Sequence, residues 1–259
     1  MNQKVIYRPS GKAAEYAPLA VNLYTGCRHA CEYCYVPRVL HVQPGKFHTQ
    51  IEPRRNILVN LLADAEKLYG DRREILLCFT SDPYQGPLTY ETTSSALKIL
   101  GAHELKATVL TKGGCEAVRD FDILQEFNFS FGSTMVFWKD SDRVEWEPLA
   151  ATVGDRMNAI RIAKLQYGLR TWVSLEPVID PAQALMLIES LHSVVDHWKI
   201  GKINYHPEIE KAVNWTEFYH IVTKLLDSHQ ADYYIKHSLQ RYADPRNNSD
   251  DLQKMKEKP

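Results

Sequence analysis

The alternation of short apolar runs with longer amphipathic stretches is the feature that most constrains how this chain can fold. Between residues 19 and 229, six segments with the composition of strands are each followed by a segment with helical periodicity. Repeated strand–helix units favour a parallel sheet covered by helices, because a parallel neighbour needs a long crossover connection. The sequence therefore predicts an α/β fold.

Periodicity and residues typical of helix ends define the boundaries of these segments. The expected strands cover residues 19–26, 74–81, 105–112, 129–137, 170–178 and 197–203. The expected helices cover residues 53–69, 92–100, 116–127, 156–167, 181–191 and 215–227. Gly168 suits a helix C-cap, and Pro181 suits a first helical position. We also expect a closing strand within 233–241 and a polar tail from Asp244.

Six strand–helix units without the glycine fingerprint of dinucleotide-binding folds suit a partial barrel. We therefore predict one domain over residues 1–259, with a core at about 16–235, folded as a partial (β/α)6 TIM-like barrel. In such barrels the functional side chains lie at the carboxyl ends of the strands. Polar residues at those ends are therefore the candidates for a site.

Composition and charge limit the class of protein. Hydrophobic residues make up 44% of the chain and charged residues 24%, as in globular domains. No uninterrupted apolar run approaches the ~18 residues that suggest a membrane span, and residues 1–14 lack the apolar core of a signal peptide. We therefore expect a cytoplasmic protein without a membrane partner. The net charge of −1 argues against a protein that binds nucleic acid mainly through phosphates.

Three of the five cysteines, Cys27, Cys31 and Cys34, lie in the sequence TGCRHACEYCY, just after the first expected strand. The odd cysteine count and the tight cluster favour a metal site over disulfides. A cubane iron–sulfur cluster takes four ligands, so three local cysteines would leave one iron open to a substrate or cosubstrate. The alternative is a structural zinc site with His29 as fourth ligand, although the second ligand pair typical of such sites is absent.

The Cys-x3-Cys-x2-Cys spacing, with the aromatic Tyr33 directly before the last cysteine, resembles the radical S-adenosylmethionine (SAM) superfamily. Four later blocks follow the order seen in its spore photoproduct lyase-like, or DNA repair photolyase-like, branch. These blocks are TSDPYQ at 80–85, LTK at 110–112, VRDFDIL at 118–124 and SLEPV at 174–178. The resemblance covers residues 16 to 205, approximately.

This resemblance implies a [4Fe–4S] cluster on Cys27, Cys31 and Cys34, with SAM chelated by the fourth iron. It implies reductive cleavage of SAM to a 5′-deoxyadenosyl radical that abstracts hydrogen from a substrate. It also implies an external electron donor of the flavodoxin or ferredoxin type.

The resemblance also assigns contacts to SAM. Tyr33 is expected near the adenine, and polar side chains at strand ends are expected near the rest of the molecule. The latter are Ser81, Asp82, Lys112, Ser133, Ser174 and Glu176. Structural alternatives remain open: Asp82 suits a capped turn, Lys112 a solvated position and Glu176 an internal ion pair.

Three residues are candidates for contact with the substrate. Tyr35 and Tyr84 lie within motif blocks and could stack on a base. In the photoproduct lyases a thiol directly precedes Thr-Ser-Asp, but here Phe79 holds that place and Cys78 precedes it. Strand alternation turns Cys78 away from the site and favours a small buried residue, unless a bulge restores its direction.

A few other polar residues receive structural interpretations. Arg156 is interpreted as a helix-start residue, with a SAM contact as the alternative. The acidic residues 140–142 and 145–147 are interpreted as a solvated loop, with a lid as the alternative. Lys202 and Asn204, after the sixth expected strand, are site candidates on position alone.

We therefore predict a radical SAM enzyme that acts on a nucleobase or nucleic acid. One alternative is the same chemistry on a peptide or small metabolite, and another is a non-catalytic iron–sulfur or zinc protein.

Overall fold

The computed structural model describes residues 3–244, which form two compact units. Within this range the first unit extends to Ser133 and also includes Asp140–Thr171. The second comprises Thr134–Lys139 and the residues from Trp172 onward. The described residues hold eight strands, which follow chain order in a mostly parallel sheet, so the predicted α/β class is confirmed. The tail predicted from Asp244 lies almost wholly outside the described residues.

The strands of the first unit end in register. They are β1 (Ile6–Tyr7), β2 (Leu19–Val21), β3 (Glu74–Leu77), β4 (Lys106–Thr111) and β5 (Ser130–Thr134). Strands β2 to β5 are parallel, with Val21 beside Leu77 and Thr111 beside Ser133, so their carboxyl ends meet at one edge. Strand β1 pairs antiparallel with β2 and was not predicted, because two residues are too few to show a period.

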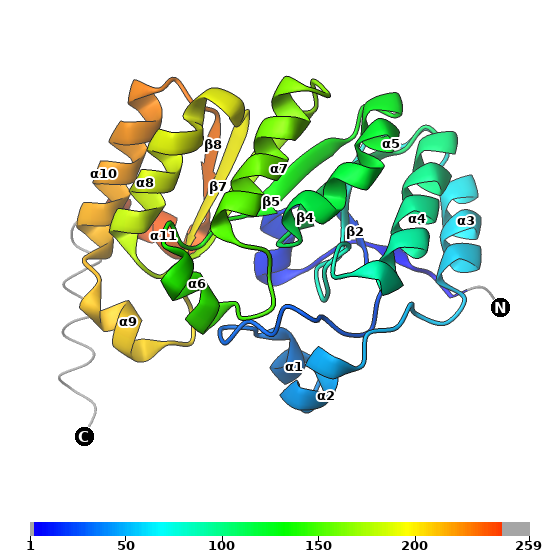
Figure 1. The fold of residues 1–259 in the computed structure, drawn as a ribbon, viewed down its shortest axis with the longest axis horizontal. Coiled ribbons are helices and arrows are strands. Elements are labelled where there is room, and N and C mark those ends of the chain that lie inside the picture. Colours follow the sequence, from blue (N-terminus) through cyan, green and yellow to red (C-terminus); the bar gives the residue numbers. More distant parts are fainter. Residues whose placement is uncertain (1–2, 245–259) are drawn as a thin grey trace. The chain divides into compact units, whose positions relative to one another are not determined.

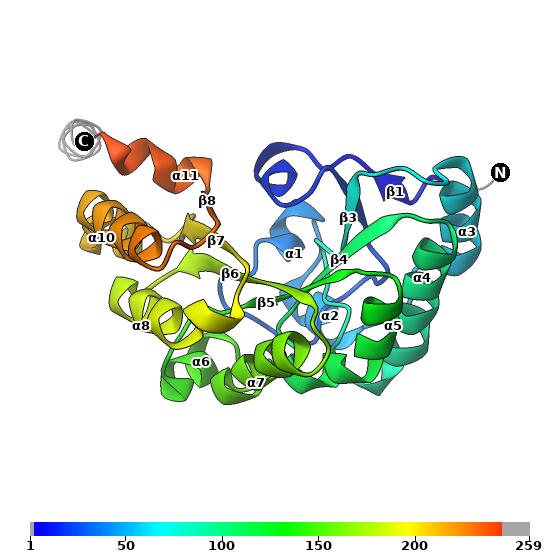
Figure 2. The ribbon, with the colours of Figure 1, turned by 90° about the horizontal axis from the view of Figure 1, so that it is seen from above.

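Four amphipathic helices of the first unit lie along one side of its strands (Figures 1 and 2). They are α3 (Ile57–Lys67), α4 (Tyr90–Ala102), α5 (Phe121–Glu126) and α7 (Val153–Leu165). Fully buried Leu61, Leu97, Leu124 and Ile160 form their inner faces. Gly168 adopts the expected positive φ, 64°, but it lies two residues beyond the C-cap of α7, which is Gln166. Three further helices of this unit are α1 (Val36–Val39), α2 (Pro44–Thr49) and α6 (Asp140–Trp146).

The second unit contains three parallel strands and their helices. The strands are β6 (Arg170–Val178), β7 (His197–Lys202) and β8 (Tyr233–Ile235). The helices are α8 (Pro181–Leu191), α9 (Pro207–Ala212), α10 (Trp215–Ser228) and α11 (His237–Gln240). Helices α8 and α10 lie side by side (Figure 1). The predicted bounds of β6 and α8 are confirmed, and Asp180 caps α8 by accepting from the backbone of Ala182 and Gln183.

Several strands end earlier than predicted, because polar side chains replace the ladder hydrogen bonds. Asn22 Oδ1 accepts from the amides of Phe79 and Thr80, at 2.8 and 3.0 Å, just beyond β2 and β3. An apolar run predicts a strand, but it does not show where a side chain, rather than the neighbouring strand, forms the hydrogen bonds to the backbone.

No helix among the described residues is long and apolar enough to span a membrane.

Candidate metal and cofactor site

The cysteine loop, defined as Gly26–Tyr35, leaves the carboxyl end of β2 and is anchored first by its own backbone. The amide of Cys27 donates to the carbonyl of Phe47 at 3.1 Å, and His48 Nδ1 lies 2.8 Å from the carbonyl oxygen of Cys27. A Cβ at Gly26 would lie 2.5 Å from the carbonyl oxygens of both Phe47 and Gln50. Only glycine therefore allows the loop to pass this close to the neighbouring backbone.

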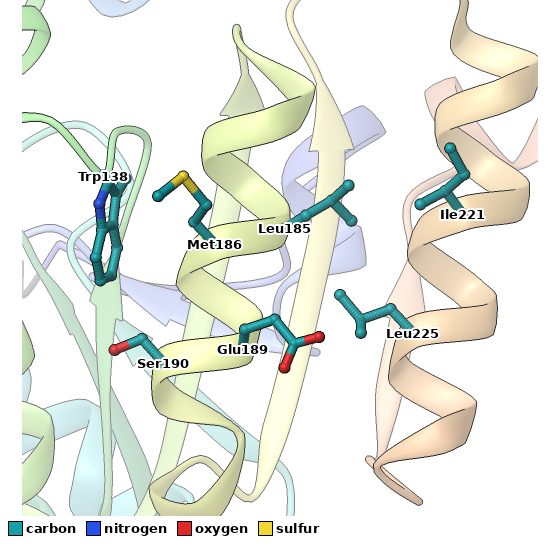
Figure 3. A pocket seen from close by; sticks show the side chains of 7 residues that line it. All are labelled: Trp138, Leu185, Met186, Glu189, Ser190, Ile221 and Leu225. Carbon is teal, nitrogen blue, oxygen red and sulfur yellow. The ribbon is translucent and has the colours of Figure 1, made fainter.

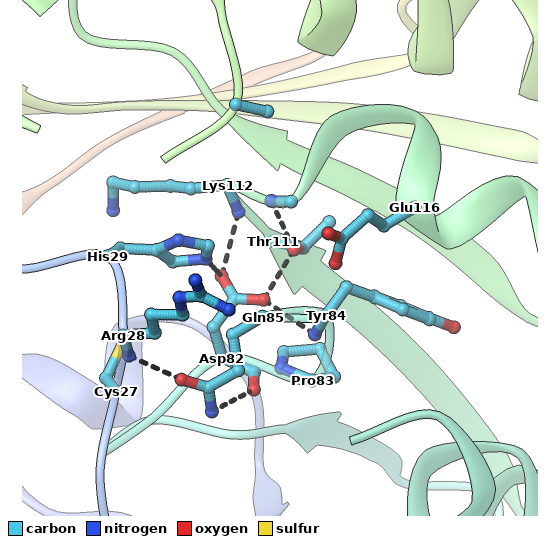
Figure 4. Close-up of polar contacts among 12 residues, drawn as sticks. Cys27, Arg28, His29, Asp82, Pro83, Tyr84, Gln85, Thr111, Lys112 and Glu116 are labelled. Carbon is cyan, nitrogen blue, oxygen red and sulfur yellow. Dashed lines mark hydrogen bonds and ion pairs between the residues drawn. The ribbon is translucent and has the colours of Figure 1, made fainter. Parts of the chain in front are cut away.

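The segment after β3 binds the cysteine loop through Gln85 (Figure 4). Gln85 Oε1 accepts from the Arg28 amide at 2.6 Å, and its Nε2 donates to the carbonyls of Gly26 and Asp82 at 3.2 and 2.9 Å. The side chain is buried, so these bonds are not exchanged for bonds to water. Gln85 therefore fixes the backbone on both sides of Cys27.

Asp82 is the centre of this network. Its Oδ1 accepts from Thr111 Oγ1 at 2.5 Å and from the Tyr84 amide at 2.8 Å. Its Oδ2 accepts from the Lys112 amide at 2.8 Å and lies 3.1 Å from His29 Nε2. Burial alone would raise the pKa of Asp82, but His29, Thr111 and the Lys112 amide outweigh burial and lower it. The carboxylate thus joins the ends of β3 and β4 to the cysteine loop, and its acceptor positions are used within the protein.

A second segment, residues 140–152, supports the other side of the loop. Sequence analysis interpreted residues 140–147 as a solvated loop; instead residues 140–146 form α6, and Glu147 is 0% exposed. Glu147 Oε1 accepts from the Tyr33 hydroxyl, and its Oε2 lies 2.6 Å from a guanidinium nitrogen of Arg156. Arg156 does lie in the first turn of α7, as expected, but its side chain is buried rather than solvated. The interpretation of the stretch as solvated was wrong because the cation partner lies nine positions further along the chain.

Lys112 differs from Asp82, Glu147 and Arg156 in having no ion pair in the described part of the chain. Its Nζ lies 5.6 Å from the centre of the Tyr33 ring, and within residues 3–244 no carboxylate oxygen forms an ion pair with it. Burial alone would lower its pKa, but Cys31 and Glu147 raise it, so the ammonium remains charged. A half-buried ammonium without an ion-pair partner favours an anion as its ligand.

The three thiols of the loop are half-buried, and burial raises their pKa values, that of Cys31 to about 12. The ammonium of Lys112 opposes this increase at Cys31 and Cys34. Three thiols with a cation beside them form a donor set for a thiolate-bound metal, because metal binding displaces the protons.

The geometry distinguishes two kinds of metal site. Among the described residues, no three His, Cys, Asp or Glu side chains lie close enough to share one ion. A cubane cluster needs no such convergence, because each thiolate binds a different iron. His29 is also unsuited to zinc, since Nε2 faces Asp82 and Nδ1 lies 3.4 Å from the carbonyl oxygen of Leu149. The donor set therefore fits a cluster and does not fit a zinc ion held with His29.

The other predicted residues of the first unit have varied surroundings. Ser81 Oγ is buried beside the Cys78 thiol, and among the described residues no oxygen or nitrogen atom is its hydrogen-bond partner. Ser133 Oγ is buried and donates to the Thr111 carbonyl at 3.3 Å. Tyr35 is 48% exposed, whereas Tyr84 is fully buried and donates to Asp120 Oδ2 at 3.1 Å. Tyr84 therefore has no ring face open to a base, because its side chain is part of the buried core.

Cys78 directly follows β3 and is buried. Its φ of 68° is left-handed, which is uncommon for a residue with a side chain, so strand alternation does not extend to it. Burial raises the pKa of its thiol to about 12. The alternation of side chains along a strand therefore cannot be used to predict whether the Cys78 thiol points toward the site or away from it.

In the second unit, the two predicted cofactor contacts lie on β6. The Ser174 carbonyl accepts from the Met135 amide at 3.0 Å, and its side chain is buried. Glu176 Oε2 lies 2.6 Å from the Nζ of Lys236, a residue that sequence analysis did not identify. A Cβ at Gly201 would lie 2.9 Å from the Glu176 carboxyl carbon, so glycine makes room for this carboxylate. The ion pair foreseen as the alternative role of Glu176 is thus present.

Lys202 also has an internal partner. Its Nζ pairs with Glu210 on α9 and donates to the Ile203 carbonyl at 3.1 Å. The Asn204 side chain donates to the Lys202 carbonyl at 2.9 Å. Both residues thereby stabilise the end of β7.

Sequence reasoning also missed Glu147 as a site residue. Its signal was a carboxylate between Trp146 and Pro148, but nothing local indicates burial. The one possible signal in the sequence was Arg156, nine positions further along the chain, as a cation that could pair with a buried Glu147.

Comparison of the amino-acid sequence with known proteins finds two relatives that match part of the chain. No protein-family model matches the chain. An uncharacterized protein of Methanocaldococcus jannaschii is 24% identical over 167 residues, which is 63% of this chain and 61% of that protein. An uncharacterized protein of Mycobacterium tuberculosis is 32% identical over 98 residues, or 36% of this chain and 29% of that protein. The match thus spans less than two thirds of either relative.

Solved structures match over most of the chain. A spore photoproduct lyase variant gives a TM-score of 0.69 at 15% identity, covering 91% of this chain and 80% of the lyase. Another lyase variant, with bound AdoMet and dinucleoside spore photoproduct, gives 0.66 at 16%, covering 85% and 76%. Streptococcus suis SuiB bound to S-adenosylmethionine gives 0.63 at 9%, covering 83% and 49%. The chain therefore has the fold of these radical SAM enzymes, which confirms the predicted partial-barrel class.

Proposed function

We propose that this protein is a radical SAM enzyme in which Cys27, Cys31 and Cys34 hold a [4Fe–4S] cluster. The observation that carries the proposal is the anchored cysteine loop at the carboxyl end of β2, in a chain with the fold of SAM-bound structures. When bound, the cluster would supply the electron that cleaves SAM reductively to a 5′-deoxyadenosyl radical. The chain's own residues hold the ligands and orient the cosubstrate.

The described contacts suggest separate roles for the residues around the loop. Asp82 and Gln85 are positioning residues, because their polar atoms bind the protein itself. Lys112 is the residue we assign to the SAM carboxylate, since its ammonium has no ion-pair partner among residues 3–244. Tyr33 is assigned to the adenine, and the buried hydroxyl of Ser81 to a polar group of SAM.

For the substrate we propose a nucleobase or nucleic acid. The exposed ring of Tyr35, directly after the last cysteine, offers a face on which a base can stack. Likeness to a lyase with bound dinucleoside supports this choice, and likeness to SuiB bound to its precursor peptide SuiA supports a peptide as the alternative. We further propose a flavodoxin- or ferredoxin-type electron donor and a cytoplasmic location, where thiols stay reduced.

The test is anaerobic. The protein is reconstituted with iron and sulfide, given SAM and dithionite, and assayed for 5′-deoxyadenosine. Cys31→Ala should abolish the product and reduce the bound iron, because it removes one cluster ligand. Cys115→Ala is the matched control, since Cys115 is also half-buried but lies outside the loop and contacts Asp155.

The outcomes separate the hypotheses. Product that depends on Cys31 but not on Cys115 supports the proposal. A protein that takes up about one zinc and no iron would contradict it. Adding dinucleotides or peptides to the same assay then shows which class accelerates SAM cleavage, and stimulation by peptides alone would overturn the choice of a nucleobase.

A further inference from the structure

A buried charged cluster closes one side of the cysteine loop. We define the Glu147 cluster as Tyr33, Glu147 and Arg156. Glu147 binds the Tyr33 hydroxyl through one carboxylate oxygen and Arg156 through the other. Burial alone would raise the pKa of Glu147, but Arg156 and Lys112 lower it, so the carboxylate is ionised. A buried carboxylate with two such partners has a defined position and little freedom to move.

The segment that carries Glu147 is fixed independently of the cysteine loop. One guanidinium nitrogen of Arg143 lies within 3.3–3.4 Å of the carbonyl oxygens of Glu147, Pro148 and Ala150. The other end of the same guanidinium binds Asp140 at 2.8 Å. This buried arginine makes residues 140–150 a rigid support.

The support holds the cysteine loop at positions on both sides of Cys31. The Glu32 amide donates to the Trp146 carbonyl at 2.9 Å, and the Leu149 amide donates to the His29 carbonyl at 3.3 Å. The Tyr33 ring stacks on Trp146 with centroids 6.5 Å apart. Of these contacts, the Tyr33–Glu147 bond is the one made to a charged group, and bonds to charged groups are the strongest of this type.

We propose that Glu147 is a positioning residue that keeps the cysteine loop in place before any metal binds. Its carboxylate anchors Tyr33, the residue between Cys31 and Cys34, to the support formed by residues 140–150. A loop ordered in advance loses less conformational entropy when it takes up a ligand. The consequence for cluster loading rests on the proposed function, whereas the effect on the loop is independent of it.

The test measures thiol accessibility in the protein without iron. Iodoacetamide modifies cysteines that local opening exposes, and mass spectrometry gives the rate at each of Cys27, Cys31 and Cys34. Glu147→Gln should raise the Cys31 and Cys34 rates about tenfold, because it weakens a charged hydrogen bond and removes the negative charge beside Arg156. The Cys34 rate decides, since Glu147 also raises the pKa of Cys31 and its loss would speed alkylation there without any opening. Tyr33→Phe should raise them by a smaller factor. Glu145→Gln is the matched control, because Glu145 is an exposed acid on the same segment.

Cys78, buried in the same unit, reports global opening. Faster modification of the loop with Cys78 still protected supports the proposal. Loop rates in Glu147→Gln no faster than in Glu145→Gln would overturn it. If Cys78 also reacts in Glu147→Gln, Tyr33→Phe decides: a faster loop with protected Cys78 supports the proposal, and an unchanged loop refutes it. A Glu147 effect in a protein that binds no iron would retain the positioning role while refuting the proposed function.

Discussion

Lysines at the carboxyl ends of strands have different partners in the two units. In the first unit, Lys112 follows β4 and its ammonium lies over the Tyr33 ring, with no ion pair to a carboxylate among the described residues. In the second unit, Lys202 at the end of β7 pairs with Glu210, and Lys236 after β8 pairs with Glu176. Burying an ammonium is costly unless it is paired. The second unit thus pairs its lysines with carboxylates of the chain, whereas Lys112 has no such pair within residues 3–244, as our proposal of an anionic ligand for it requires.

The largest expected effect is on the stability of the second unit. Lys236→Met should lower the free energy of unfolding by about 3 kcal/mol, because it removes the cation that lies 2.6 Å from the part-buried carboxylate of Glu176. Urea unfolding measures this loss. Adding Glu176→Gln to the same variant should restore part of it, and exposed Lys224→Met is the matched control. If Lys236→Met were as stable as Lys224→Met, the ion pair would have no structural role and the contrast would fail.

Asp82 tests the network of the first unit through pH. Because its folded-state pKa is lowered, its stabilising contribution is present above the unfolded-state pKa of about 3.9 and is lost as pH falls through the lower folded value. Asp82→Asn should therefore lose about 2 kcal/mol at neutral pH and show a flatter decline of stability in acid. Urea unfolding at several pH values measures both effects. Identical pH profiles for wild type and Asp82→Asn would contradict the assignment; exposed Asp122→Asn is the control.

The smallest free-energy change is expected at Lys112. Lys112→Met should weaken SAM binding to the reconstituted protein about tenfold, because it deletes the cation assigned to the carboxylate. Calorimetric titration with SAM measures this change. Stability should stay close to wild type, since no ion pair is lost. Lys112→Arg should retain part of the affinity, and exposed Lys98→Met should bind SAM normally. If Lys112→Met lost much stability but kept its affinity for SAM, Lys112 would have a structural role like that of Lys236.

Much of the fold could be predicted because its signals are local. Alternating strand and helix periodicity identified the α/β class, and Pro181 identified the start of α8. The cysteine spacing identified the loop as a site from residues that are neighbours in sequence. Strand β1 and helix α6 were missed, since one is too short for a period and the other consists largely of charged residues.

The sequence by itself determined which elements form and where the thiols lie along the chain. Only the tertiary structure decided how the charged residues pair. Asp82 meets His29 across 53 positions, Glu176 meets Lys236 across 60, and Glu147 meets Arg156 across nine. The physical reason is that periodicity reports which face of an element is buried, whereas the partner of a buried charge depends on which elements the fold places next to each other.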